Sequence, residues 1–124
     1  MVNKQDYINA VNQNIDMVRG DNLAFNFQLS GLGSKGAYDA LLFTLAVAEH
    51  YDDISIFECT NGNGIELENY DATSDTATFS VLVAPNKTKT LDLARYYYDL
   101  QMKYNNNVVT LMRGRLTLVY DVAD

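Results

Sequence analysis

Apolar and polar residues alternate with a period of two along most of this chain, a pattern typical of strands that bury one face. The alternation is clearest from Leu91 to Val122, where two long runs are separated by three asparagines. The apolar set of the first run is Tyr96, Tyr98, Leu100 and Met102. Because asparagine tolerates a positive φ, the asparagines at 105–107 predict the turn of a hairpin between the two runs.

In the second run one alternating set is more apolar than the other, and we expect that set to face the core. It comprises Val108, Thr110, Met112, Gly114, Leu116, Leu118 and Tyr120. The two runs therefore predict neighbouring strands that contribute to one buried face.

Shorter strands are predicted before this hairpin, because alternating runs are bounded there by Gly, Asn, Asp and Pro. They cover residues 15–18, 23–29, 40–50, 54–59, 65–69 and 76–84. Residues 40–50 would also suit a helix, since Ala and Leu are good helix formers. The alternation of Phe43, Leu45 and Val47 with Thr and Ala favours a strand instead.

The connecting segments are rich in turn residues. Residues 61–64 contain two Asn-Gly pairs, which predict a tight hairpin turn between the strands on either side. Residues 30–39 hold three of the seven glycines and are predicted to be a loop. Pro85 ends the strand before it, and one helical turn is expected around residues 88–92.

About eight strands in 124 residues predict an all-β protein, an immunoglobulin-like antiparallel β-sandwich. At this length one domain is expected, and we place it at residues 15–124. Residues 1–14 are predicted to be a flexible or short helical arm.

The charge of the chain restricts its partners. It carries 16 Asp and Glu against 9 Lys and Arg, a formal net charge of −7. Clustered positive charge is needed to contact phosphates, so neither nucleic acid nor an anionic membrane is expected as a partner. No run approaches the roughly 20 apolar residues of a membrane-spanning helix.

Residues that carry catalysis are sparse, and we predict no enzymatic activity and no cofactor. His50 is the one histidine and Cys59 the one cysteine. Neither lies in a pattern typical of a nucleophile with its base. Cys59 suits packing near a strand end, and His50 suits a solvated turn.

Acidic pairs in loops raise the question of calcium, which prefers oxygen ligands. The pairs are Asp52 with Asp53, and Asp71 with Asp75. Aspartate also initiates turns, and the spacing of a calcium-binding loop is absent, so we favour solvated turn carboxylates.

Gly20 and Asp21 are predicted to have a structural role in the turn between the first two strands. With Arg19 they form the Arg-Gly-Asp tripeptide of integrin ligands. Three residues match by chance often, and a strand-breaking glycine between two apolar runs accounts for these, so we favour a turn.

A first resemblance lies in Leu91, Ala94, Tyr96 and Tyr98. This spacing resembles the Leu-x-x-Ala-x-Tyr-x-Cys pattern that leads into strand F of immunoglobulin-like domains. The resemblance implies that Tyr96 forms a tyrosine corner. It also implies that Tyr98 replaces the disulfide cysteine, so the domain is immunoglobulin-like but not of the antibody type.

A second resemblance covers most of the chain and rests on the order of short motifs. The motifs are Ile15-x-x-x-Arg19-Gly20-Asp21-Asn22-x-x-Phe25-x-Phe27, Phe43-Thr44-Leu45, Gly64-Ile65, Tyr96-x-Tyr98-Asp99-Leu100-Gln101 and Val109-Thr110-Leu111-x-x-Gly114-x-Leu116. They resemble small tail-associated domains of tailed bacteriophages and prophages. The chain is similar to the N-terminal domain of the phage baseplate upper protein.

This resemblance implies a non-enzymatic structural or adaptor protein of a phage tail or baseplate. Such a protein would contact other tail or baseplate proteins and copies of itself, assemble in the host cytoplasm and reside in the virion tail. The alternative is a carbohydrate-binding or adhesin-type module, because tyrosine rings can stack on sugars. The candidates for an interface or a ligand are Tyr97, Tyr51 and Tyr70.

Overall fold

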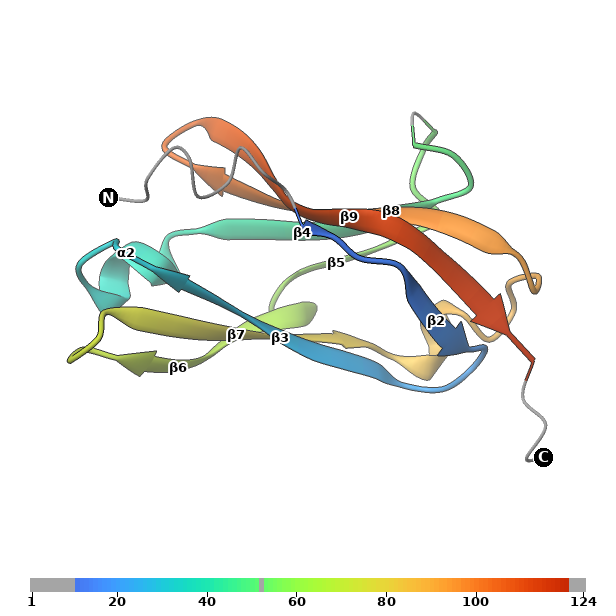
Figure 1. The fold of residues 1–124 in the computed structure, drawn as a ribbon, viewed down its shortest axis with the longest axis horizontal. Helices are drawn as coiled ribbons and strands as arrows, with labels where there is room; N and C mark the ends of the chain where they lie inside the picture. Colours follow the sequence, from blue (N-terminus) through green and yellow to red (C-terminus); the bar gives the residue numbers. More distant parts are fainter. Residues whose placement is uncertain (1–10, 52, 121–124) are drawn as a thin grey trace.

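The computed structural model describes residues 11–51 and 53–120, which form two packed layers of strands (Figure 1). The strands are β1 (Val11–Asn12), β2 (Ile15–Val18), β3 (Leu23–Ser30), β4 (Leu42–Ala48), β5 (Phe57–Asn61), β6 (Gly64–Asp71), β7 (Thr76–Val83), β8 (Arg95–Tyr104) and β9 (Asn107–Val119). One layer contains β5, β4, β8 and β9 in that order, with β1 and β2 beside β9. The other layer contains β6, β7 and β3.

The strand order is that of an immunoglobulin-like domain. The neighbours β4, β8 and β9 correspond to strands C, F and G, and the neighbours β6, β7 and β3 to strands D, E and B. Pairing is antiparallel between these neighbours, whereas β1 and β2 run parallel to β9. The predicted all-β sandwich is confirmed, with about eight strands besides the two-residue β1 in the described part of the chain.

The core lies between the layers and is filled by the inward side chains of alternating strand residues. Phe27, Phe43 and Phe79 meet within it, with the ring centroids of Phe43 and Phe79 4.6 Å apart. Leu45 and Val47 are buried beside them. Residues 42–48 form a strand, as predicted, because β5 and β8 pair with both of its edges and override the helix propensity of Ala and Leu.

The hairpin of β8 and β9 is present, but its faces differ from the prediction close to the turn. Val109 is buried there, and Val108 is 63% exposed. A bulge at Leu111 is the cause, because successive residues of β8 pair with Met112 and then with Thr110. One extra residue exchanges the two faces of a strand, so the prediction that Val108 faces the core is wrong.

The turn at residues 61–64 is tight, but it does not join the predicted hairpin. β5 pairs with β4 and β6 pairs with β7, so the turn carries the chain from one layer to the other. β5 and β6 meet only through Thr60 with Gly64 and Asn61 with Ile65, in a parallel register and not the antiparallel one of a hairpin. The Asn61 side chain accepts from the N–H of Phe43 at 2.6 Å and donates to the carbonyl of Leu41 at 2.9 Å. It thereby extends the pairing beside β4. The Asn-Gly pairs specify a turn, but they do not specify which strands pair.

Residues 30–39 are not wholly a loop, which corrects another prediction. They include the short helix α2 (Lys35–Asp39), whose N-cap Ser34 accepts from the N–H of Ala37 at 3.3 Å. Tyr38 of this helix is fully buried and anchors it to the sandwich. The sequence predicts a helical turn around residues 88–92. The structure instead has a 3-10 turn, η1 (Pro85–Lys87), just before them.

Two boundaries also differ from the prediction. β5 begins at Phe57 and not at residue 54, and Ile54 is 93% exposed in the loop before it. Of the predicted arm, residues 1–10 lie outside the described residues, and Val11–Asn12 pair with β9. In the described part of the chain no helix has the length and hydrophobicity needed to cross a membrane.

Candidate functional site

Tyr96 lies where the chain enters β8. Its hydroxyl donates to the carbonyl oxygen of Asp92 at 2.9 Å, which is the geometry of a tyrosine corner. Burial raises the pKa of this phenol, and the carboxylates of Asp92 and Glu49 act in the same direction. Because the Tyr96 hydroxyl is neutral and bonded to a backbone carbonyl, we infer that its role is structural.

Tyr98 points into the core and fastens the N-terminal strands. Its hydroxyl donates at 2.5 Å to the carbonyl oxygen of Gln13, between β1 and β2. Burial, with a smaller effect of Tyr51, raises the pKa of Tyr98 to about 12. Gly114 provides the space, because a Cβ at this position would overlap the Gln13 carbonyl group. Where antibody domains carry a disulfide, this chain has a hydroxyl bonded to its N-terminal segment.

Gly20 and Asp21 lie in the turn between β2 and β3. Gly20 has a φ of +84°, and its N–H donates to the Thr88 hydroxyl at 3.0 Å. The Arg19 guanidinium donates to the carbonyl of Leu91 at 3.1 Å. The Arg-Gly-Asp turn is thus packed on the segment that precedes β8, with Arg19 held by the fold.

Tyr70 belongs to a hydrogen-bonded group that we call the Asp75 cluster: Gly31, Gly33, Tyr38, Tyr70 and Asp75. The Asp75 carboxylate accepts from the N–H groups of Gly31 and Gly33 at 3.1 and 2.9 Å. It also accepts from the hydroxyls of Tyr38 and Tyr70, each at 3.1 Å. The cluster therefore joins the loop before α2, the helix itself and the turn between β6 and β7.

The electrostatics of the Asp75 cluster follow from these bonds. Burial alone raises the pKa of Asp75, but the four hydrogen bonds outweigh it and the net shift is downward. Burial, reinforced by the Asp75 carboxylate, raises the pKa of Tyr38 and of Tyr70. Both phenols stay protonated and donate to Asp75, so Tyr70 contributes to the fold.

Tyr51 and Tyr97 meet on the outer face of the layer that contains β4, β8 and β9. Their ring centroids are 4.5 Å apart, with the ring planes at 47°. Tyr51 extends from the loop after β4, and its hydroxyl donates to the carbonyl of Gly114 at 3.2 Å. The Arg113 guanidinium carbon lies 4.6 Å from the centroid of the Tyr51 ring, a cation–π contact.

These rings border a hollow of about 50 Å³, which we call the Tyr51–Tyr97 hollow. Its lining is Ala46, Ala48, His50, Tyr51, Asp53, Ser55, Tyr97, Tyr98 and Asp99. The register explains the space, because Ala48 is opposite Tyr97 and Ala46 is opposite Asp99. Two small side chains beside an aromatic and an acidic one leave the sheet surface concave there.

The acidic groups of the hollow have unused hydrogen-bonding capacity. Burial raises the pKa of Asp99, an effect that its cross-strand neighbour Arg113 opposes. The carboxylates of Asp99 and Asp53 form no hydrogen bond or ion pair with any described residue. Acceptors of this kind beside a partly exposed aromatic ring are typical of sites for polar ligands.

The three candidate tyrosines thus separate: Tyr51 and Tyr97 lie together, and Tyr70 lies in the Asp75 cluster. The sequence pattern identified neither Asp99 as a residue of the hollow nor Arg113 as its cross-strand neighbour. A hairpin without a bulge would place Asp99 opposite Met112, and the bulge places it opposite Arg113. The alternation along β8 was visible in the sequence, but this shift of register was not.

Other residues considered for chemistry have structural surroundings. The His50 ring is 6.5 Å from that of Tyr97 at the rim of the hollow. Cys59 is buried, and burial raises the pKa of its thiol, with Lys87 opposing; such a thiol is a poor nucleophile. Within residues 11–51 and 53–120, no three His, Cys, Asp or Glu side chains are grouped to hold a metal ion. Asp71 instead accepts from the N–H of Thr73 at 2.9 Å.

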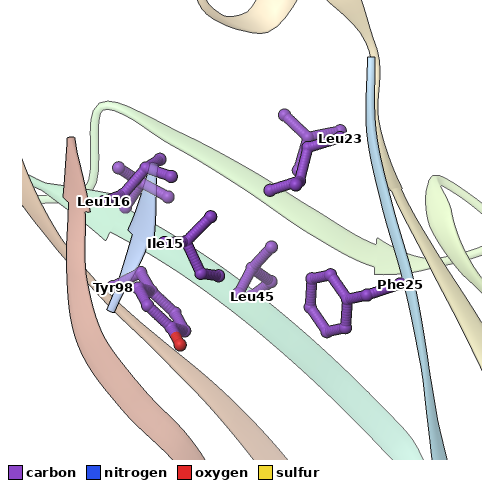
Figure 2. Close-up of a pocket in the computed structure, with 8 residues that line it drawn as sticks. Ile15, Leu23, Phe25, Leu45, Tyr98 and Leu116 are labelled. Atoms are coloured by element: carbon purple, nitrogen blue, oxygen red, sulfur yellow. The ribbon is translucent and has the colours of Figure 1, made fainter. Parts of the chain in front are cut away.

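A different kind of candidate is the edge formed by β3. Among the described strands β3 pairs only with β7, over eight residues without a bulge. It contains no charged residue and no proline, the features that usually prevent edges from pairing. Leu23 and Phe25 point inward toward Leu45 and Tyr98, and the gap among them is about 10 Å³ (Figure 2). The core behind β3 is therefore filled. On the side of β3 away from β7, backbone N–H and C=O groups are available for pairing with another strand.

Comparison with known proteins identifies no family. No protein-family profile and no curated protein matches the chain. Among solved structures, it is similar to AggA, the major subunit of aggregative adherence fimbriae type I from Escherichia coli. The identity is 16%, the match covers 89% of this chain and 91% of that chain, and the TM-score is 0.38. Similarity at this level supports no conclusion about function.

Proposed function

We propose that this chain is a non-enzymatic structural or adaptor protein of a bacteriophage or prophage tail, which assembles through protein–protein contacts. The open edge of β3 is the observation that carries the assembly part of the proposal. The motif resemblance described above carries the assignment to a tail or baseplate.

The charge distribution favours pairing at β3 over pairing elsewhere. Two copies that each carry a net charge of −7 repel one another at most orientations. The eight residues of β3 carry no charge, and the residues of β7 beside them are uncharged as well. Repulsion is therefore weakest where the backbone of one copy can meet the backbone of another.

The sequence of β3 also suits pairing with itself. A two-fold axis at Asn26 or at Phe27 brings two β3 strands together antiparallel, with apolar residues opposite apolar ones. In either register the core-facing side chains of one β3 strand lie next to those of the other. On the outer face, amide side chains of the two copies lie opposite one another. The two sheets then join into one across the contact.

Sedimentation velocity over a range of concentrations tests this assembly. We expect the wild-type chain to self-associate and the double variant Asn26→Lys, Gln28→Lys to remain monomeric, because like charges then meet at the edge. Ser80→Lys is the matched control, since Ser80 lies opposite Asn26 one strand inward. A monomeric wild-type chain, or a variant that associates as well as the wild type, would contradict edge pairing.

The tail assignment has a separate test. Virions induced from a lysogen that encodes this chain should contain it, as detected by mass spectrometry of purified particles and by immunogold labelling at the tail. Its absence from intact particles would contradict the tail assignment and leave the test of edge pairing unaffected.

A further inference from the structure

We propose that the Tyr51–Tyr97 hollow is a binding site for one neutral pyranose sugar. This goes beyond assembly, because it concerns the outer face of the opposite layer and needs only one copy of the chain. The shape of the hollow, the groups that line it and the charge nearby all favour such a ligand.

The shape suits a ring that lies on the surface and inserts one edge. A volume of about 50 Å³ is too small to enclose a sugar, so it accommodates one or two substituents. Ala46 and Ala48 line the hollow together with the aromatic side chains of Tyr51 and Tyr97. An aromatic wall offers an apolar surface to the C–H face of a pyranose, while the hydroxyl groups at its edge enter the hollow.

The polar groups that line the hollow favour a ligand that both donates and accepts hydrogen bonds. The carboxylate oxygens of Asp53 and Asp99, which line the hollow, accept hydrogen bonds. His50 adds a group that donates and accepts. Hydroxyl groups satisfy all of these partners at once, because each has one proton and two lone pairs.

The charge nearby separates a sugar from the main alternative, an alkylammonium group. Arg113 already lies over the Tyr51 ring, where an ammonium ligand would place its charge. Arg113 also lies opposite Asp99 and partly offsets its carboxylate. A second cation would meet repulsion there, whereas a neutral polyol would not.

Affinity at one such site should be weak, with a Kd on the order of 1 mM, because few groups contact the ligand. The test is a titration of the ¹⁵N-labelled protein with methyl β-D-galactopyranoside, methyl β-D-glucopyranoside and N-acetylglucosamine, followed by NMR. We expect saturable shifts of the amides at 46–51 and 97–99 with at least one of these sugars.

Variants locate the binding. Tyr97→Ala should weaken it at least tenfold, and Asp99→Asn should weaken it with the fold unchanged. Tyr120→Ala, at a tyrosine that is 67% exposed beyond the end of β9, should leave it unaltered. The proposal is overturned if none of the sugars shifts these amides, if tetramethylammonium shifts them instead, or if folded Tyr97→Ala binds as well as the wild type. None of these outcomes depends on self-association, so a failure here leaves the assembly proposal standing.

Discussion

The Asp75 cluster and the Tyr51–Tyr97 hollow both place tyrosines beside aspartates, yet the carboxylates of the two sites differ in the hydrogen bonds that they accept. In the Asp75 cluster one carboxylate receives four hydrogen bonds, and its pKa is lowered. In the hollow the Asp99 carboxylate forms no bond with a described residue, and burial raises its pKa.

The difference teaches how to separate a structural tyrosine from a binding one. A tyrosine hydroxyl that contributes to the fold donates to a partner inside the protein, as those of Tyr38, Tyr70 and Tyr51 do. Tyr97 has an aromatic neighbour but no hydrogen bond from its hydroxyl to a described residue, so its hydroxyl remains available to a ligand. The predictions below test this contrast, beginning with the largest effect.

Gly114→Ala should have the largest effect, because the new methyl group overlaps the Gln13 carbonyl. We expect a loss of about 3 kcal/mol in the free energy of unfolding, measured by urea denaturation. Gly36→Ala in α2 is the control beside the Asp75 cluster. No atom outside the neighbouring residues and the backbone of the helix lies within 4 Å of the added methyl group there, and alanine favours a helix. Equal stability of the two variants would contradict this account of Gly114.

Tyr38→Phe and Tyr97→Phe remove one hydroxyl from each site. Tyr38→Phe leaves the Leu32 N–H without its acceptor and removes one of the four hydrogen bonds to the Asp75 carboxylate, so it should cost about 1–2 kcal/mol in thermal or urea unfolding. Tyr97→Phe should change stability by less than about 0.5 kcal/mol. The contrast fails if Tyr97→Phe costs as much as Tyr38→Phe.

The two aspartates should respond oppositely to pH. The folded-state pKa of Asp75 lies below its ordinary value of 3.8, so its stabilisation is present above that value and is lost as the pH falls through the lowered pKa. The folded-state pKa of Asp99 lies above 3.8, so its contribution is present below that value and is lost as the pH rises through the raised pKa.

Asparagine variants measure this difference by calorimetry. At pH 7 Asp75→Asn should lower the Tm, and the deficit should shrink toward pH 3. Asp99→Asn should leave stability unchanged or raise it by up to about 0.5 kcal/mol at pH 7. A lower Tm for Asp99→Asn at pH 7 would show that this carboxylate stabilises the fold.

Period-two alternation was sufficient to predict the sandwich, because one buried face per strand determines where its apolar residues fall. It failed where a single residue changed the register, as at Leu111, and where a side chain replaced backbone pairing, as at Asn61. The Asp75 cluster could not be predicted, since it joins Gly31 to Asp75 across 44 positions of sequence. Tyr51 and Tyr97 were identified from the sequence as residue types, but their proximity depends on the loop that carries Tyr51 over β8.

Hydrogen exchange of the β3 amides at two protein concentrations tests the central claim, that this edge pairs with a second copy, most directly. In the monomer, the amides of Leu23–Ser30 that point away from β7 have no strand partner and should exchange rapidly. At high concentration the same amides should be protected, and in the Asn26→Lys, Gln28→Lys variant they should exchange rapidly at both concentrations. Association of the wild-type chain without any change in the exchange of these amides would contradict the claim.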